Sequence, residues 1–101
     1  MVKTVARPGG GIVVAYDDAD GHSRRLTLTA VDNRGSVLTT EIDGHYPTNV
    51  ELTVVAAPDG SETAHLFFGQ YLSPNLIHAR VDLSTSDVAR WRIKITPPER
   101  P

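Results

Sequence analysis

The chain has 101 residues, a formal net charge of −2 and no cysteine. Its length suits one domain, and the lack of cysteine excludes disulfides, thiolate zinc sites and cysteine nucleophiles. The small net charge gives no overall attraction to nucleic acid, and no apolar run is long enough to span a bilayer. We therefore expect neither nucleic acid nor a membrane as a partner, and a reducing, cytoplasmic location is favoured.

Residues 1–10 contain no apolar run of the kind found in a signal peptide and lead into a glycine run, so we expect a flexible lead-in. Seven stretches follow in which apolar and polar residues alternate with a period of two, which indicates half-buried β-strands. In chain order they cover 11–17, 24–31, 36–42, 50–57, 62–68, 76–83 and 89–95. Residues 97–101 form a proline-rich tail, since proline cannot donate to a sheet ladder.

The alternation also assigns an inner face to each strand. Over 24–31, Leu26, Leu28 and Ala30 share one face. Over 89–95, the same rule points Trp91 inward and Arg90 outward. No stretch has the periodicity of an amphipathic helix.

These strands predict an all-β fold, a single antiparallel β-sandwich or flattened barrel of about seven strands. Glycine-containing turns at Asp32–Gly35 and Pro58–Gly60 separate them. The strands resemble the immunoglobulin and fibronectin type III architecture in number and length only. The cysteine pair of antibody domains is missing, and the one tryptophan lies on the last strand rather than the third.

A faint repeat runs through the chain. Gly35-Ser36 recurs 25 positions later as Gly60-Ser61, and Gly44-x-Tyr46 recurs at the same offset as Gly69-x-Tyr71. Coincidence between turn residues explains this, and so does a duplicated strand–loop–strand unit.

Successive connections of an antiparallel sheet fall at opposite ends. The first, third and fifth connections, around residues 17–22, 43–49 and 69–75, should therefore share one end, which we call the loop end. That loop end would carry aromatic, amide, imidazole and carboxylate groups, which suit a carbohydrate or a protein segment. Its candidate ligand-binding residues are Tyr46, Tyr71, His45, Asn49, Gln70, Asn75, Asp18, Asp20 and His22. Alternatively, Tyr46 and Tyr71 cap the core.

The stretch around Asp18, Asp20 and Gly21 resembles the start of a calcium loop. The frame fails, because Tyr16 and Thr27 occupy the positions of the first and last ligands. We expect a turn, with a metal site shared with Asp43 as the remaining alternative.

A second candidate surface lies on strands 62–68 and 76–83. A hairpin register that joins His65 to His78 also joins Phe67 to Leu76, all on the outer face. Apolar residues there indicate a covering sheet or partner subunit, so these four residues form a candidate homo-oligomer interface. Two histidines could bind a metal, but no third ligand is evident, and we expect no metal and no cofactor.

The last two strands would place Arg80 beside Arg92 in a basic outer row, which we interpret as a solvated sheet face. No catalytic motif is present. The first functional hypothesis is therefore a non-catalytic module that binds a carbohydrate or protein partner at the loop end. The second is a structural homo-oligomer assembled through the Phe67 and Leu76 face, and the third is a small hydrolase.

Overall fold

The computed structural model describes residues 1–19, 24–43, 46–85 and 87–94. This part of the chain forms eight strands and no helix, and hence no helix that could cross a membrane. The strands are β1 (Val2–Ala6), β2 (Ile12–Ala19), β3 (Arg24–Val31), β4 (Val37–Asp43), β5 (Pro47–Ala56), β6 (Glu62–Gln70), β7 (Asn75–Asp82) and β8 (Val88–Lys94).

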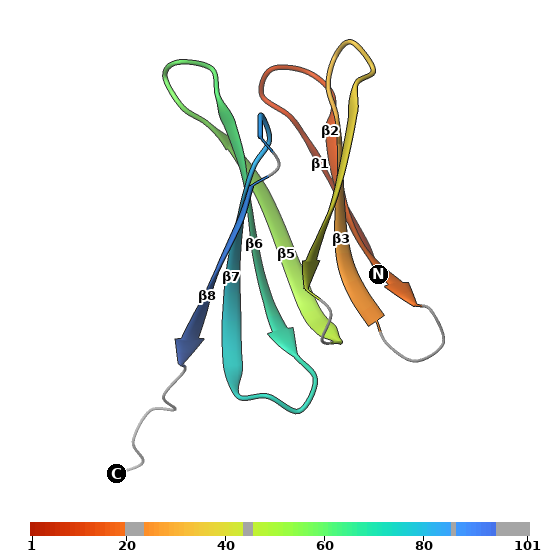
Figure 1. Ribbon diagram of the computed structural model, residues 1–101, viewed down its shortest axis with the longest axis vertical. Helices are drawn as coiled ribbons and strands as arrows, with labels where there is room; N and C mark the ends of the chain where they lie inside the picture. The colour runs from red at the N-terminus through yellow and green to blue at the C-terminus, as the bar shows by residue number, and fades with distance from the viewer. Residues whose placement is uncertain (20–23, 44–45, 86, 95–101) are drawn as a thin grey trace.

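Two four-stranded antiparallel sheets pack face to face, and each is a simple meander (Figure 1). The first has the order β1-β2-β3-β4 and the second β5-β6-β7-β8. The all-β prediction is confirmed, and of its two forms the structure has the sandwich. Its meander connectivity differs from the Greek key of immunoglobulin domains.

One strand was not expected from the sequence. Residues 2–6 form β1 instead of a flexible lead-in, with Val2 opposite Tyr16 and Ala6 opposite Ile12. Most β1 side chains are exposed. An edge strand of this kind needs no alternating pattern, which is why period-two reasoning missed it.

The core lies between the two sheets, where the alternating apolar faces meet. The predicted inner faces of β3, β6 and β7 are buried as expected. Buried core residues are Val13, Ala15, Leu26, Leu28, Ala30, Ile42, Val50, Ala64, Leu66, Phe68, Ile77, Ala79, Val81 and Leu83. Packing these side chains out of water is the main force that holds the two layers together.

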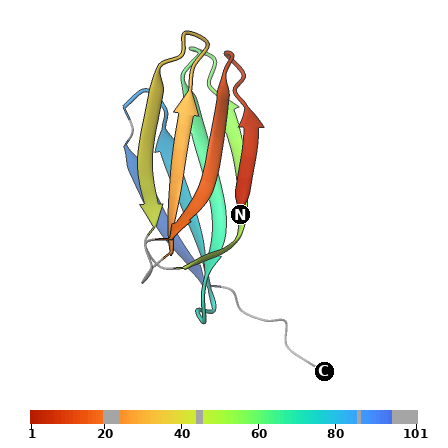
Figure 2. The ribbon, with the colours of Figure 1, turned by 90° about the vertical axis from the view of Figure 1, so that its right-hand side faces the viewer.

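Four hairpin turns gather at one end of the sandwich (Figure 2). In three of them the first residue donates its N–H to the carbonyl four residues on, and the fourth residue donates back to the first. The glycine at the fourth position has positive φ each time. These turns begin at Arg7, Asp32 and Ala57, 25 positions apart. The Gly35-Ser36 and Gly60-Ser61 copies of the sequence repeat thus lie in turns of the same geometry.

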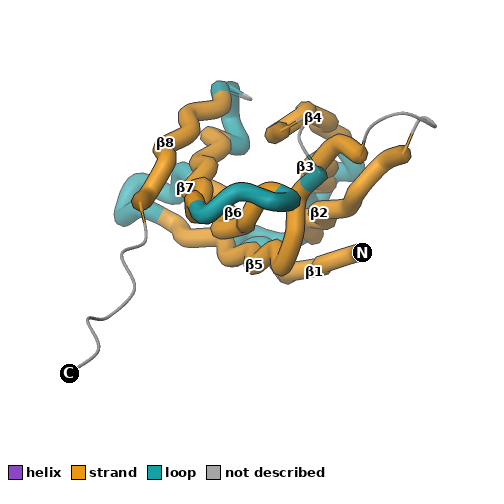
Figure 3. The backbone as a smooth tube through the Cα atoms, turned by 90° about the horizontal axis from the view of Figure 1, so that it is seen from below, coloured by secondary structure: helices purple, strands orange, loops and turns teal. Residues whose placement is uncertain are grey.

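The two long edges of the sandwich are closed differently. β1 and β5 lie side by side along one edge (Figure 3). At the opposite edge, Arg90 of β8 reaches β4, where its Nη1 donates to the Ile42 carbonyl at 3.0 Å. The chain therefore crosses from the β4 edge to the β5 edge at the loop end, and this crossover carries Tyr46.

Candidate functional site

The crossover from β4 to β5 fixes Tyr46 between the two sheets. Its N–H donates to the Arg24 carbonyl at the start of β3 (3.2 Å), and its own carbonyl accepts from the Tyr71 N–H (3.0 Å). Tyr71 lies in the loop between β6 and β7. These two backbone bonds bring together residues that are far apart in the sequence.

The rings of Tyr46 and Tyr71 form an open cradle. Their centroids lie 6.3 Å apart with an angle of 49° between the planes. Both rings are accessible, since Tyr46 is 44% and Tyr71 66% exposed. With Arg24, Pro47 and Thr48 they line a cavity of about 300 Å³, which we call the tyrosine pocket. The exposure argues against the alternative that both tyrosines serve as buried caps of the core.

The backbone around the tyrosine pocket is strained. Among the described residues, three that are not glycine have positive φ, namely Tyr46 (46°), Asn49 (52°) and Leu72 (60°), and all lie at this end. Each such residue costs on the order of 1 kcal/mol or more, and such positions cluster at ligand sites. Gly69 contributes by its small size, because a Cβ there would come within 2.7 Å of the Thr48 hydroxyl.

The other predicted loop-end residues are only partly assembled there. Gln70 donates from its amide to Asp43 Oδ2 at 3.0 Å, and Asp43 is buried, with 3% exposed. Asn49 is exposed in a bulge of β5, and Asn75 begins β7. Asp18 belongs to β2, where it pairs with Arg25 along the backbone. Asp20, His22 and His45 lie outside the described residues.

Asp43, which was considered as a ligand of a shared metal site, takes part in a network of hydrogen bonds and ion pairs between strands. Its carboxylate accepts from Gln70 and faces Arg90 at 3.6 Å. Within the described ranges, no three residues among histidine, aspartate and glutamate are grouped to hold a metal ion.

The outer face of the second sheet carries the second candidate surface, with a register that differs from the expected one. Phe67 is opposite His78, His65 is opposite Arg80, and Leu76 is opposite Gly69. The predicted register, with His65 opposite His78 and Phe67 opposite Leu76, was therefore wrong by two residues. A shift of two keeps every side chain on its face, so His65, Phe67 and His78 still lie together.

Trp91 corrects another prediction. It lies opposite His78 on the outer face and is 43% exposed, whereas Arg90 turns toward the first sheet. The inward assignment of Trp91 failed because β8 is an edge strand whose inner face meets the buried Asp43 carboxylate. The basic row was also wrong, since Arg80 pairs with Ala89 and not with Arg92.

Phe67, His78 and Trp91 form an aromatic row across β6, β7 and β8. The Phe67 and His78 rings stack with centroids 4.4 Å apart and planes at 5°, and His78 lies 5.1 Å from Trp91 at 35°. The Arg80 guanidinium carbon sits 5.2 Å from the Trp91 ring centroid, in cation–π contact. Neither Trp91 nor Arg80 was a predicted site residue.

His65 joins the aromatic row through a hydrogen bond. Its Nδ1 lies 3.1 Å from His78 Nε2, so at least one of the two rings is neutral when the bond forms. Burial, followed by the charges of His78 and Arg80, lowers the pKa of His65 below its ordinary value.

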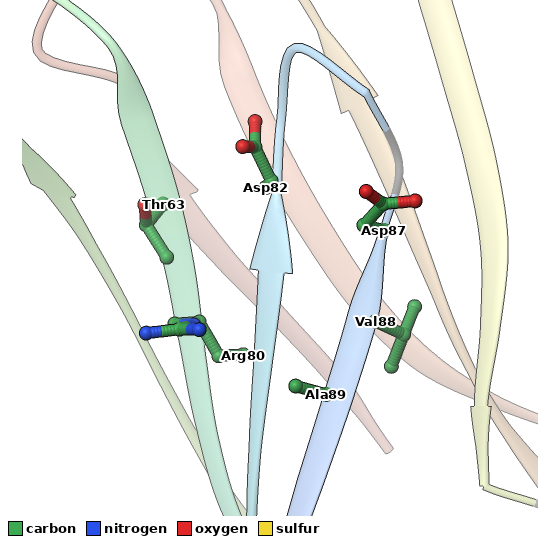
Figure 4. A pocket seen from close by; sticks show the side chains of 6 residues that line it. All are labelled: Thr63, Arg80, Asp82, Asp87, Val88 and Ala89. Atoms are coloured by element: carbon green, nitrogen blue, oxygen red, sulfur yellow. The ribbon is translucent and has the colours of Figure 1, made fainter.

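A cavity of about 370 Å³ adjoins the aromatic row near the β7–β8 hairpin (Figure 4). Thr63, Arg80 and Ala89 line it from β6, β7 and β8, and Asp82 and Asp87 line it nearer the hairpin. The Asp82 carboxylate already accepts from the N–H and the hydroxyl of Ser84, at 2.8 and 2.6 Å. These bonds stabilise the β7–β8 hairpin, so we interpret the cavity as a result of the turn geometry and not as a ligand site.

Comparison of the chain with protein-family models, with curated proteins and with solved structures finds no match. The tyrosine pocket and the aromatic row are therefore the two features that bear on function. Of the residues that sequence reasoning missed, Trp91 had a usable signal. Phe67 and His78 face outward on adjacent strands, and cross-strand pairing favours another large side chain beside them on the next strand, which predicts an outward Trp91.

Proposed function

We propose that the protein is a non-catalytic binding module that holds a carbohydrate in the tyrosine pocket. The observation that carries this proposal is the pair of exposed tyrosine rings, which lie at 49° to each other and line a cavity of about 300 Å³. A cavity of this size lies at the lower end of the range for ligand sites, about 300–1,000 Å³. It would admit roughly one sugar ring.

The chemistry of the lining suits a sugar. A tyrosine face packs against the apolar face of a pyranose ring, and its hydroxyl offers a hydrogen bond at the rim. Thr48 adds a third hydroxyl to those of the two tyrosines, and Arg24 adds guanidinium donors. A protein segment with an apolar side chain is the competing ligand, favoured by Leu72, which is exposed beside Tyr71.

A glycan array followed by titration calorimetry tests the proposal. We expect binding to immobilised glycans, and we expect Tyr71→Ala to weaken it by roughly tenfold or more, as loss of a central aromatic contact does. Tyr71 is the better position to change because this residue is more exposed than Tyr46. The melting temperature of Tyr71→Ala should therefore stay close to that of the wild type.

The control is Trp91→Ala, which removes an exposed aromatic ring from the other surface and should leave glycan affinity unchanged. Binding that survives both Tyr71→Ala and Tyr46→Ala would refute the pocket as the site. Binding to a peptide array but to no glycan would show that the ligand of the pocket is a protein segment and not a carbohydrate.

A further inference from the structure

We infer that the outer face of β5–β8 is a homodimer interface, in which a second copy of this chain lies face to face with the first. A two-fold axis parallel to the strands relates the two copies. The inference is independent of the tyrosine pocket, which lies at the loop end of the sandwich.

The two outer faces of the molecule differ in a way that points to a partner. On the first sheet, Tyr16, Thr29 and Thr39 form a hydroxyl ladder, with bonds of 3.3 and 3.1 Å, as a hydrated sheet face does. On the second sheet the corresponding centre is the aromatic row, where Phe67 is 37% exposed. Large exposed aromatic rings in one contiguous patch are typical of interface cores.

The order of residues along the aromatic row makes it self-complementary. Glu51 of β5 is opposite Phe67, so the row reads Glu51, Phe67, His78, Trp91 from β5 to β8. Strands lie about 4.8 Å apart, so the row spans roughly 14 Å. A two-fold axis parallel to the strands, between Phe67 and His78, reverses this order in the second copy.

The reversal pairs opposite charges. It lays Glu51 of one copy near the partner's Trp91 and the partner's Arg80, whose guanidinium rests on that ring. In the described part of the chain, neither Glu51 nor Arg80 takes part in an ion pair within 4 Å. A two-fold axis along the row would instead place Glu51 on the partner's Glu51, which like-charge repulsion disfavours. Charge complementarity therefore selects the axis parallel to the strands.

The single tryptophan of the chain gives a direct readout, because it lies in the proposed interface. In a concentration series, Trp91 emission should shift to the blue as the rings become covered. The midpoint should coincide with the dissociation constant from sedimentation equilibrium. Phe67→Glu should raise that constant by about 100-fold or more, since a buried aromatic anchor is replaced by a charge. Val37→Glu adds the same charge to an exposed apolar position of the first sheet and should change nothing.

A charge exchange tests the axis itself. Glu51→Arg and Arg80→Glu should each raise the dissociation constant by about tenfold, and the double variant should return it toward the wild-type value. Both side chains are exposed, so these variants keep the test open if Phe67→Glu fails to fold. Tyr71→Ala should leave the dimer intact, which separates this inference from the function of the tyrosine pocket.

A wild-type chain that stays monomeric at the highest attainable concentration would overturn the inference and leave a different partner as the occupant. A dimer that tolerates Phe67→Glu would do so as well, because it would use another surface. Failure of the double variant to recover would overturn the pairing of Glu51 with the partner's Arg80.

Discussion

Arg90 of β8 crosses from one sheet to the other to reach Asp43 of β4, with Nη1 3.6 Å from Asp43 Oδ1 and 3.0 Å from the Ile42 carbonyl. Gln70 of β6 donates to the other oxygen of the same carboxylate at 3.0 Å. One buried carboxylate thus joins three strands from both sheets. It lies at the end of β4, directly before the crossover that carries Tyr46.

Asp43→Ala should lower the free energy of unfolding by about 1–3 kcal/mol, because it strips the Gln70 amide of its acceptor, whereas the half-exposed Arg90 guanidinium remains hydrated. Chemical denaturation checks this. Asp87→Ala changes the same residue type at an exposed position and should stay within about 0.5 kcal/mol of the wild type. Equal effects of the two variants would contradict the structural role of Asp43.

Glu62 should make the fold sensitive to acid. Burial raises its pKa, but the Gly9 N–H and the Arg7 guanidinium hold that pKa below its ordinary value of 4.5. Their bonds to the carboxylate measure 3.0 Å from Gly9 and 2.8 Å from Arg7 Nη2. The stabilisation is therefore present above pH 4.5 and is lost as the pH falls through the lowered pKa.

At neutral pH, Glu62→Gln should cost about 1–2 kcal/mol, and the difference from the wild type should shrink on acidification. Glu41→Gln makes the same change at an exposed position of β4 and serves as the control. A difference that is constant with pH would show that the charge of Glu62 plays no part.

Gly11 is required for two reasons and Gly35 for one. Gly11 has φ of +95°, and a Cβ there would overlap the Val31 carbonyl, whereas Gly35 has φ of +85° with open space around it. Gly35→Ala should therefore cost about 1 kcal/mol through backbone strain alone. Gly11→Ala should cost distinctly more, about 3 kcal/mol or above, since the β2–β3 pairing must shift. Thermal unfolding of the two variants side by side measures the difference.

The lowered pKa of His65 predicts a second, milder pH dependence. The fold disfavours protonated His65, whereas the unfolded chain binds the proton near the ordinary value of 6.5. The free energy of unfolding should therefore decline as the pH falls below 6.5. His65→Gln should flatten this slope in denaturation curves recorded from pH about 7.5 to about 5. A slope unchanged by the substitution would assign the effect to another group. Low protein concentration keeps dimerisation out of the measurement.

Much of the fold follows from local pattern. The alternation of Leu26, Leu28 and Ala30 fixed which face of β3 is buried, because a half-buried strand has only one phase that hides its apolar side chains. The alternation of strand direction likewise placed the short turns at Asp32–Gly35 and Pro58–Gly60 at the same end. Strand β1 was not predicted, because the side chains of this edge strand are mostly exposed and show no alternation of apolar and polar residues.

The candidate sites were harder to predict because they depend on distances between strands. Sequence reasoning placed Tyr46 and Tyr71 at one end, but it did not find Arg24 and Thr48, which the crossover brings beside them. It placed His65, Phe67 and His78 on one face, but chose a register two residues away from the real one. Trp91 was assigned to the wrong face, since alternation alone cannot tell a core from an interface.

The sequence alone determined the all-β class, the order of strands and turns, which loops lie at one end and which side chains of most strands lie on one face. These features follow from the side-chain period of two in a strand and from the residues that turns require. Only the tertiary structure decided the strand register, the outward side of Trp91 and the burial of Asp43. Each of these depends on which strand lies opposite, and side chains that meet across two sheets leave no trace in the order of residues along one strand.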